Sequence, residues 1–271
     1  MVISDELFEA FLKCKTKAYQ LFLANPGRLR FTDSIGEWQW KIRNDFRREY
    51  VKTLSSENQN VYVVGTLTKD QLKFREYQWI INPEITSEDL ASKPELLENI
   101  SFNFQNTNDS SYIPIRLFPS EKINEDHKQL LAFDALVLGK YTGQFPTFGK
   151  IVYGRQKLVA RIKFNELIRK VESLVEDLRT MLEKNVDPLF ALNKHCSECE
   201  FESRCRDKAA KDDDLSLLGG ISPKEMMKLR SKGIFTVTQL SYTFRPRRRK
   251  SKSSIKRYDK YHYALKALAI R

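Results

Sequence analysis

The chain has 271 residues, 41% of them hydrophobic and 30% charged, which suits one large folded domain or one domain with a small module. It contains no apolar run of about 18 residues, and this excludes a membrane-spanning helix. The net charge of +12 favours an anionic partner, with nucleic acid as the first candidate.

The first part of the chain predicts helices and then β-strands. Apolar residues at helical spacing indicate helices over residues 4–24 and 35–54. Short β-branched or alternating runs predict strands over residues 61–65, 77–81, 100–104 and 112–118.

The middle of the chain alternates less regularly. A helix over residues 125–138 is expected to end at Gly139, and strands are expected over residues 150–154 and 158–162. Residues 164–184 carry the clearest helical pattern, with apolar residues every three or four positions. This order is typical of an α/β sandwich and is too irregular for a doubly wound sheet.

The four cysteines of the chain suggest one metal centre. Cys196, Cys199 and Cys205 are spaced as C-x2-C-x5-C, and thiolates at this spacing bind a single ion or cluster. Cys14 lies 182 residues before Cys196. The alternatives are unrelated buried thiols or disulfides. Residues 1–11 are acidic where a signal peptide is basic, so we expect a cytoplasmic chain, which favours metal over disulfides.

A second region begins after the cysteines, so we predict domains over residues 1–210 and 211–271. Gly219 and Gly220 stand between two short helical stretches, as in a helix-hairpin-helix module. Glycines let a turn approach a phosphate closely, the next helix start offers N–H groups, and Lys224 adds a charge. The alternative is a helix–helix turn that only packs.

A basic segment follows this turn. Residues 241–260 hold nine Lys or Arg and one Asp, a net +8 of the +12 of the whole chain. Like charges at this density resist packing, so the segment is expected to be flexible and solvated. Its Lys and Arg side chains could then bind phosphates without sequence preference. The alternative is a solubilising loop. The candidate contacts here are Arg245, Arg247, Arg248, Arg249 and Lys250.

Four stretches carry a family resemblance: KQLLAFDALVLG, HCSECEFESRC, DDDLSLLGGIS and KGIFTVTQLSYTFRPRRR. Together with Cys14, they resemble the RecB-like iron–sulfur nucleases of the PD-(D/E)XK superfamily. The chain looks closest to members that continue into an RNase H-like exonuclease domain and a helicase. The resemblance covers nearly all residues and is strongest from Lys128 onward. It implies a restriction-endonuclease-type α/β sandwich, clipped by a [4Fe–4S] cluster on the four cysteines, with zinc as the second choice.

The catalytic motif of that superfamily is missing from the expected strands. The chemistry needs an Asp on one strand and Glu-x-Lys on the next, which together hold Mg²⁺ or Mn²⁺ and position the attacking water. In this chain Arg116 stands at the Glu position and Phe118 at the Lys position. The preceding stretch offers no Asp but only Asn99, Ser101 and Asn103.

Three functions remain open from the sequence. The first is a catalytically degenerate protein that binds DNA without sequence preference and serves a partner nuclease or helicase. The second is an active nuclease, using Mg²⁺ or Mn²⁺, whose ligands have moved to Glu84, Glu121 or Asp126. The third is a scaffold that docks an enzyme partner and does not bind DNA.

Overall fold

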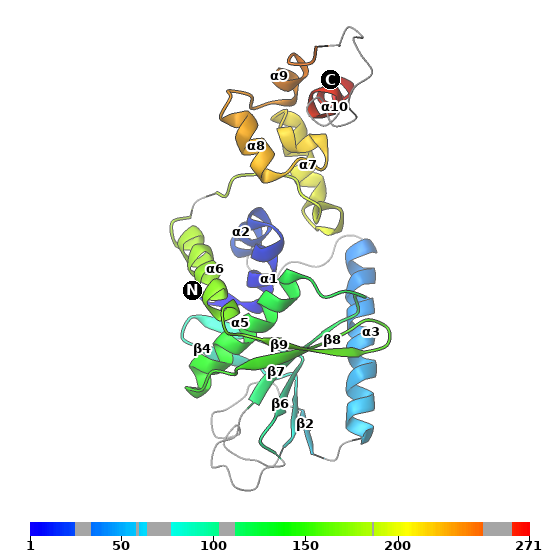
Figure 1. The fold of residues 1–271 in the computed structure, drawn as a ribbon, viewed down its shortest axis with the longest axis vertical. Helices are drawn as coiled ribbons and strands as arrows, with labels where there is room; N and C mark the ends of the chain where they lie inside the picture. Colours follow the sequence, from blue (N-terminus) through cyan, green and yellow to red (C-terminus); the bar gives the residue numbers. More distant parts are fainter. Residues whose placement is uncertain (25–33, 58–59, 64–76, 103–111, 186, 246–261) are drawn as a thin grey trace, which may run out of the picture. The chain divides into compact units, whose positions relative to one another are not determined.

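The computed structural model describes residues 1–24, 34–57, 60–63, 77–102, 112–185, 187–245 and 262–271. The chain divides into two compact units, unit 1 (Met1–Pro188) and unit 2 (Leu189–Arg271) (Figure 1). The boundary predicted after residue 210 falls inside helix α7 (Glu202–Lys211) of unit 2. Unit 1 mixes helices and sheets, so the predicted α/β class is confirmed.

Unit 1 is built on two mixed sheets. The large sheet has the order β2 (Val61–Val63), β3 (Trp79–Ile81), β6 (Leu96–Asn99), β7 (Tyr112–Phe118), β8 (Phe148–Tyr153) and β9 (Leu158–Lys163). The small sheet has the order β1 (Ile3–Ser4), β5 (Leu90–Ser92) and β4 (Ile85–Ser87). The helices are α1 (Asp5–Lys13), α2 (Lys15–Leu23), α3 (Ser34–Glu57), α5 (Glu125–Thr142) and α6 (Leu167–Glu183).

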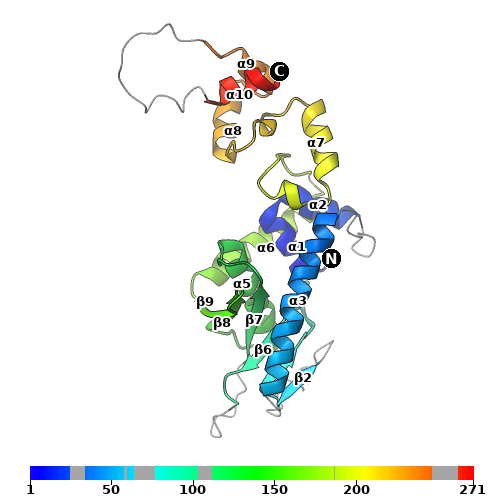
Figure 2. The same ribbon diagram turned by 90° about the vertical axis from the view of Figure 1, so that its right-hand side faces the viewer.

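Helices cover both faces of the large sheet. Strands β6 and β7 are antiparallel, whereas β7 and β8 are parallel and α5 provides the crossover between them. Helix α3 runs along one face (Figure 2), where its Tyr50 and Leu54 pack on Ile115. Helices α1, α5 and α6 pack on the opposite face around Phe8 and Phe133.

Strand β7 is the centre of this arrangement because all seven of its residues are buried. Side chains alternate between the two faces of a strand. Ile115 and Leu117 point toward α3 and belong to its apolar cluster. Arg116 therefore points to the other face, toward α1 and α5, where an apolar residue would be the ordinary choice.

The helix predicted over residues 4–24 is wrong in one respect, because it is broken into α1 and α2 at Cys14. Cys14 adopts an extended conformation, with φ −164° and ψ 118°. Phe11 before the break and Tyr19 after it belong to the same apolar core. Both segments therefore contribute to one core despite the extended residue between them.

Two further boundaries differ from expectation. Helix α5 continues through Gly139 and ends at Gly143, whose left-handed φ of 80° makes it the C-cap. The strand expected over residues 100–104 is instead β6, which ends at Asn99. Residues 103–104, and residues 64–65 of the first predicted strand, lie outside the described residues.

Unit 2 is helical in the described residues, and its short elements enclose a small core. They are η2 (Cys196–Glu198), α7, η3 (Leu215–Leu218), α8 (Pro223–Arg230), α9 (Val237–Ser241) and α10 (His262–Ile270). The core includes Leu215, Ile221, Val237 and Ala267. Across the described parts of both units, every helix is too short or too polar to cross a membrane.

Candidate functional site

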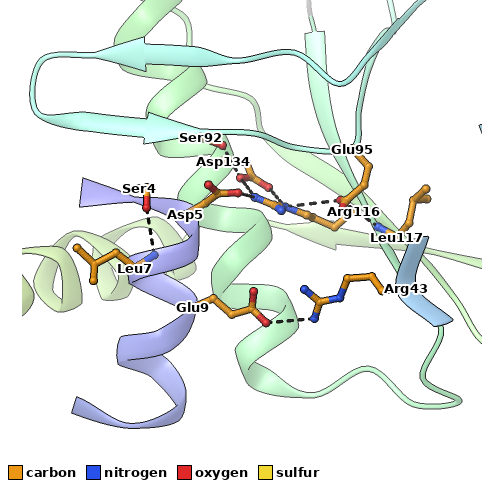
Figure 3. A network of polar contacts seen from close by, with 10 residues as sticks. All are labelled: Ser4, Asp5, Leu7, Glu9, Arg43, Ser92, Glu95, Arg116, Leu117 and Asp134. Carbon is orange, nitrogen blue, oxygen red and sulfur yellow. Dashed lines mark hydrogen bonds and ion pairs between the residues drawn. The ribbon is translucent and has the colours of Figure 1, made fainter. Parts of the chain in front are cut away.

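Charged side chains gather around Arg116 in strand β7 (Figure 3). Its Nη2 lies 2.5 Å from Asp134 Oδ1, and its Nε donates to Asp134 Oδ2 over 2.6 Å. The two residues thus form a bidentate pair with two hydrogen bonds. The same Nη2 donates to Asp5 Oδ2 over 2.6 Å. The side chains of Arg116, Asp134 and Asp5 are 7%, 0% and 8% exposed, so the group is closed off from water.

Two more residues complete the group. Ser92 Oγ donates to Asp134 Oδ1 over 2.6 Å. Glu95 Oε2 lies 3.8 Å from Arg116 Nε and also accepts a hydrogen bond from the backbone of Leu117 over 3.3 Å. We call this set the Arg116 network: Asp5, Ser92, Glu95, Arg116 and Asp134.

The local sequence explains how each partner is placed. Asp5 opens helix α1, which Ser4 caps by accepting a hydrogen bond from Leu7 N. Asp134 lies in the middle of α5, where residues 129–139 are all buried. A carboxylate at such a position is stable only with a partner, and Arg116 is the cation that faces it.

Three carboxylates around one guanidinium set the protonation states. Burial alone lowers the pKa of Arg116, but the carboxylates outweigh this effect and raise it well above its ordinary value. Burial raises the pKa of Asp134 to about 6, while Arg116 opposes this rise. At neutral pH the two residues therefore form an ion pair.

A second and less buried ion pair lies beside the network and joins α1 to α3 (Figure 3). Glu9 Oε1 is 3.2 Å from Arg43 Nη2 and 2.7 Å from Lys13 Nζ. Burial raises the pKa of Glu9, but these two cations overcome it and hold the pKa well below the usual range. Glu9 thus stays ionised across the physiological pH range.

The two side chains at the positions expected for Glu and Lys each contact another residue. Arg116 is paired as described, and the Phe118 ring stacks on His127 with centroids 3.9 Å apart. On β6, Asn99 is buried and its Oδ1 accepts a hydrogen bond from Ser101 N over 3.0 Å. Asn103 lies outside the described residues. None of these side chains supplies the carboxylate or the lysine that the motif requires.

The alternative metal ligands lie apart from the network. Glu84 pairs with Lys93 over 2.7 Å, and Glu121 lies 3.8 Å from Arg155 on the surface. Asp126 lies in the first turn of α5. In the part of the chain that the structure describes, no three His, Cys, Asp or Glu side chains are arranged to hold a metal ion.

The predicted cysteine ligands are of intermediate exposure, and none of the four is in a disulfide among the described residues. Cys14 lies in unit 1, whereas Cys196 starts η2, Cys199 follows it and Cys205 lies in α7, all in unit 2. The backbone N–H of Asn193 donates to Cys196 Sγ over 3.2 Å, a hydrogen bond typical of cluster-bound sulfur. The donor chemistry fits a thiolate-bound metal or cluster, although the described thiols are not gathered into a group of three.

The predicted phosphate turn has the expected backbone but its own internal partners. Gly219 and Gly220 have φ values of 57° and 75°, which favour glycine. At the start of α8, Ser222 and Glu225 form a capping box that uses their own two backbone N–H groups, and Pro223 has none. The side chain of Lys224, the next residue, is exposed and could contact a phosphate at this turn.

The structure describes only the first five residues of the basic segment, residues 241–245. Arg245 is exposed and is the last residue described in the first part of the segment. The other predicted contacts, Arg247, Arg248, Arg249 and Lys250, lie outside the described residues.

His127 makes the stability of unit 1 depend on pH. Burial against Phe118 lowers its pKa to about 4, below the 6.5 of an unfolded chain. The unfolded state therefore takes up a proton first, so His127 stabilises the fold above pH 6.5 and this stabilisation is lost as the pH falls toward 4. Asp134 acts in the opposite direction, because its folded pKa is raised.

We predict that His127→Gln flattens this pH dependence, since Gln keeps the capping box with Asn124 and removes the titration. Urea unfolding followed by tryptophan fluorescence reports on unit 1, which contains all three tryptophans. Between pH 7 and pH 5 the parent should lose on the order of 1 kcal/mol more than the variant. Asp134 is present in both proteins, so the difference isolates His127. Parallel curves would contradict the assignment.

Sequence reasoning missed Asp134, Asp5 and Glu95 as members of the site. One signal was present, because Asp134 interrupts the apolar run LLAFDALVL just as Arg116 interrupts YIPIRLF. Opposite charges in two buried segments indicate a buried pair. Asp5 gave no such signal, since an acidic residue at a helix start is ordinary.

No protein-family model matches the chain, and no curated protein matches it either.

Proposed function

We propose that the chain is a catalytically degenerate RecB-like protein that binds DNA without cutting it. The Arg116 network is the observation that carries this proposal. Residue 116 is the position at which the resemblance requires a metal-binding Glu, and a buried guanidinium stands there between Asp134 and Asp5.

The chemistry explains why this substitution disables cleavage. Hydrolysis of a phosphodiester in this superfamily needs carboxylates free to hold Mg²⁺ or Mn²⁺. Arg116 already neutralises the nearby carboxylates and would repel a divalent cation. Phe118, in place of the lysine, has no group that positions or activates water.

The order of the elements agrees with the resemblance. The strand expected to carry Glu-x-Lys is β7, and the helix expected to follow it is α5, with β6, which ends at Asn99, before both. Gln129 and Phe133, which replace a Gln-x3-Tyr motif, both lie on α5 and are buried. These features support the RecB-like assignment of unit 1.

The proposal includes a [4Fe–4S] cluster ligated by Cys14, Cys196, Cys199 and Cys205, with zinc as the second choice. Four thiolates are the usual ligands of such a cluster. Its role here is to tie together segments far apart in the sequence. By resemblance, the protein serves a helicase or an RNase H-like exonuclease in the cytoplasm.

DNA binding is assigned to the basic segment and the turn before it. The candidate contacts are Lys224, Arg245, Arg247, Arg248, Arg249 and Lys250. Lys and Arg side chains that contact phosphates release counterions, which gives affinity without sequence preference.

The test uses one labelled DNA with two readouts, retention and integrity. The parent should retain DNA and leave it intact with Mg²⁺ or Mn²⁺. If five or so basic residues engage, the logarithm of affinity should fall with the logarithm of salt at a slope of about −4. Replacing Arg247, Arg248, Arg249 and Lys250 by Ala should flatten the slope by about three units for every sequence.

Two results would overturn the proposal. Metal-dependent cleavage that disappears in Glu121→Ala or Asp126→Ala would show an active nuclease with moved ligands. A parent that retains no DNA at low salt would favour the scaffold. If the quadruple variant kept the parent slope, the basic segment would not be the DNA site.

A further inference from the structure

A basic groove lies where strand β9 leads into helix α6, beside the start of α5. Its charged lining comprises Lys128, Arg161, Lys163 and Lys170, with Glu125 and Glu166. All four basic residues come from unit 1, far in sequence from the basic segment at residues 241–260. We call this the β9–α6 groove.

The basic residues of this groove differ in their partners. Lys128 pairs with Glu125 over 2.6 Å, and the Arg161 guanidinium lies over the Phe148 ring, 3.6 Å from its centroid. Among the described residues, Arg161, Lys163 and Lys170 make no ion pair within 4.0 Å. The groove lining holds four Lys or Arg and two Glu. The groove therefore has an excess of positive charge that favours a polyanion.

Elsewhere in unit 1, exposed lysines sit against carboxylates. Lys93 pairs with Glu84 over 2.7 Å, and Lys140 pairs with Glu88 over 2.8 Å. These two lysines provide a matched comparison, because their charge is already compensated locally.

An aromatic surface adjoins the basic groove. A neighbouring apolar groove is lined by Phe145, Phe164 and Ile168, and both grooves share Asn165. Phe145 is 51% exposed. One side of its ring rests on Gly139 of α5, where a Cβ would collide with the ring. Gly139 thus lets α5 support the ring while about half of the residue stays exposed.

We infer that the β9–α6 groove binds single-stranded nucleic acid, with phosphates along the basic residues and a base stacked on Phe145. Single-strand binding proteins combine these two elements, a basic groove and an exposed aromatic ring. A duplex can satisfy the basic residues but keeps its bases paired, so it cannot stack one on Phe145. The inference rests on the proposed function and adds a second surface and a strand preference.

The test compares a labelled single strand of about 20 nucleotides with the duplex of the same sequence, both bound to the full chain. The parent should prefer the single strand. Phe145→Leu, which still packs on Gly139, should weaken single-strand binding about tenfold and leave duplex binding unchanged. Phe145→Trp should restore the preference.

A second experiment tests the basic residues. It compares the double variant Arg161→Ala/Lys163→Ala with the control Lys93→Ala/Lys140→Ala, which also removes two positive charges. The first should flatten the single-strand salt slope by about 1.4 units, at about 0.7 per contact. The second should leave the slope near that of the parent.

The outcomes separate this inference from the proposed function. If Phe145→Leu and Arg161→Ala/Lys163→Ala both bind like the parent while the quadruple variant of residues 247–250 does not, the groove assignment is wrong and DNA binding stands. If polyglutamate displaces the single strand as well as an equally charged oligonucleotide does, the groove takes acidic protein segments instead. A parent that binds neither DNA overturns both proposals.

Discussion

Arg116→Met is expected to destabilise unit 1 by about 3–5 kcal/mol, a large fraction of the roughly 5–15 kcal/mol that stabilises an ordinary protein. The reason is that the variant leaves Asp5 and Asp134 buried without their cation. Methionine fills much of the space of the arginine stem, so lost packing accounts for little of the effect. Urea unfolding followed by tryptophan fluorescence measures the loss.

Arg179→Met is the matched control. Arg179 also has two acidic partners, Asp89 at 2.7 Å and Glu176, and it lies in the same unit. Its side chain is 24% exposed, and water compensates for a lost partner there. The control should therefore cost about 1 kcal/mol or less. Equal losses for the two variants would show that the buried Arg116 network contributes no more to the free energy of unfolding than the more exposed Arg179 pairs do.

A double variant tests whether the uncompensated charge is the cause. Asp134→Asn removes that charge at nearly constant shape and keeps an acceptor for Ser92. Arg116→Met/Asp134→Asn should be more stable than the sum of the single losses by on the order of 1–3 kcal/mol. Strict additivity would mean that the two side chains contribute independently, contrary to the ion pair described.

The sequence was informative where one segment determines its own structure. Residues 112–118 read as a strand and residues 164–184 as a helix, and β7 and α6 fall there. The turn at Gly219 was also visible, because its left-handed backbone favours glycine. In each case the physical cause lies within a few neighbouring residues.

Features that depend on distant contacts were not predictable in the same way. The break at Cys14 has no Gly or Pro that would predict it, and the segments on both sides contribute to one core through Phe11 and Tyr19. The Arg116 network needs the register of β7 and the approach of α1 to α5. Arg116 alone indicated a lost metal site, whereas only the folded chain showed which carboxylates it holds.

The cysteine proposal gives the second large prediction. Protein purified without oxygen should be brown and contain about four irons per chain. Cys199→Ala should lose iron and become insoluble or protease-sensitive. The physical reason is that linking Cys14 to the Cys196–Cys205 segment closes a very long loop and removes much entropy from the unfolded chain.

Two variants show which residues hold the cluster. Ser197→Ala changes the same segment without touching a thiol, so it should keep the parent's iron content and colour. Cys14→Ala should lose iron if the cluster uses a ligand from the first helices, as proposed. Iron retained in Cys14→Ala at the parent's level would remove Cys14 from the ligand set.

Metal identity is decided by analysis of the same samples. Colourless protein with stoichiometric zinc would reject iron and keep the four-thiolate site, because zinc takes the same ligands. Protein with neither metal that unfolds like Cys199→Ala would reject the site altogether. Cysteine thiols must lose their protons to bind either metal, so acidification should release the metal. Chelation should likewise lower the stability of the parent but not that of Cys199→Ala.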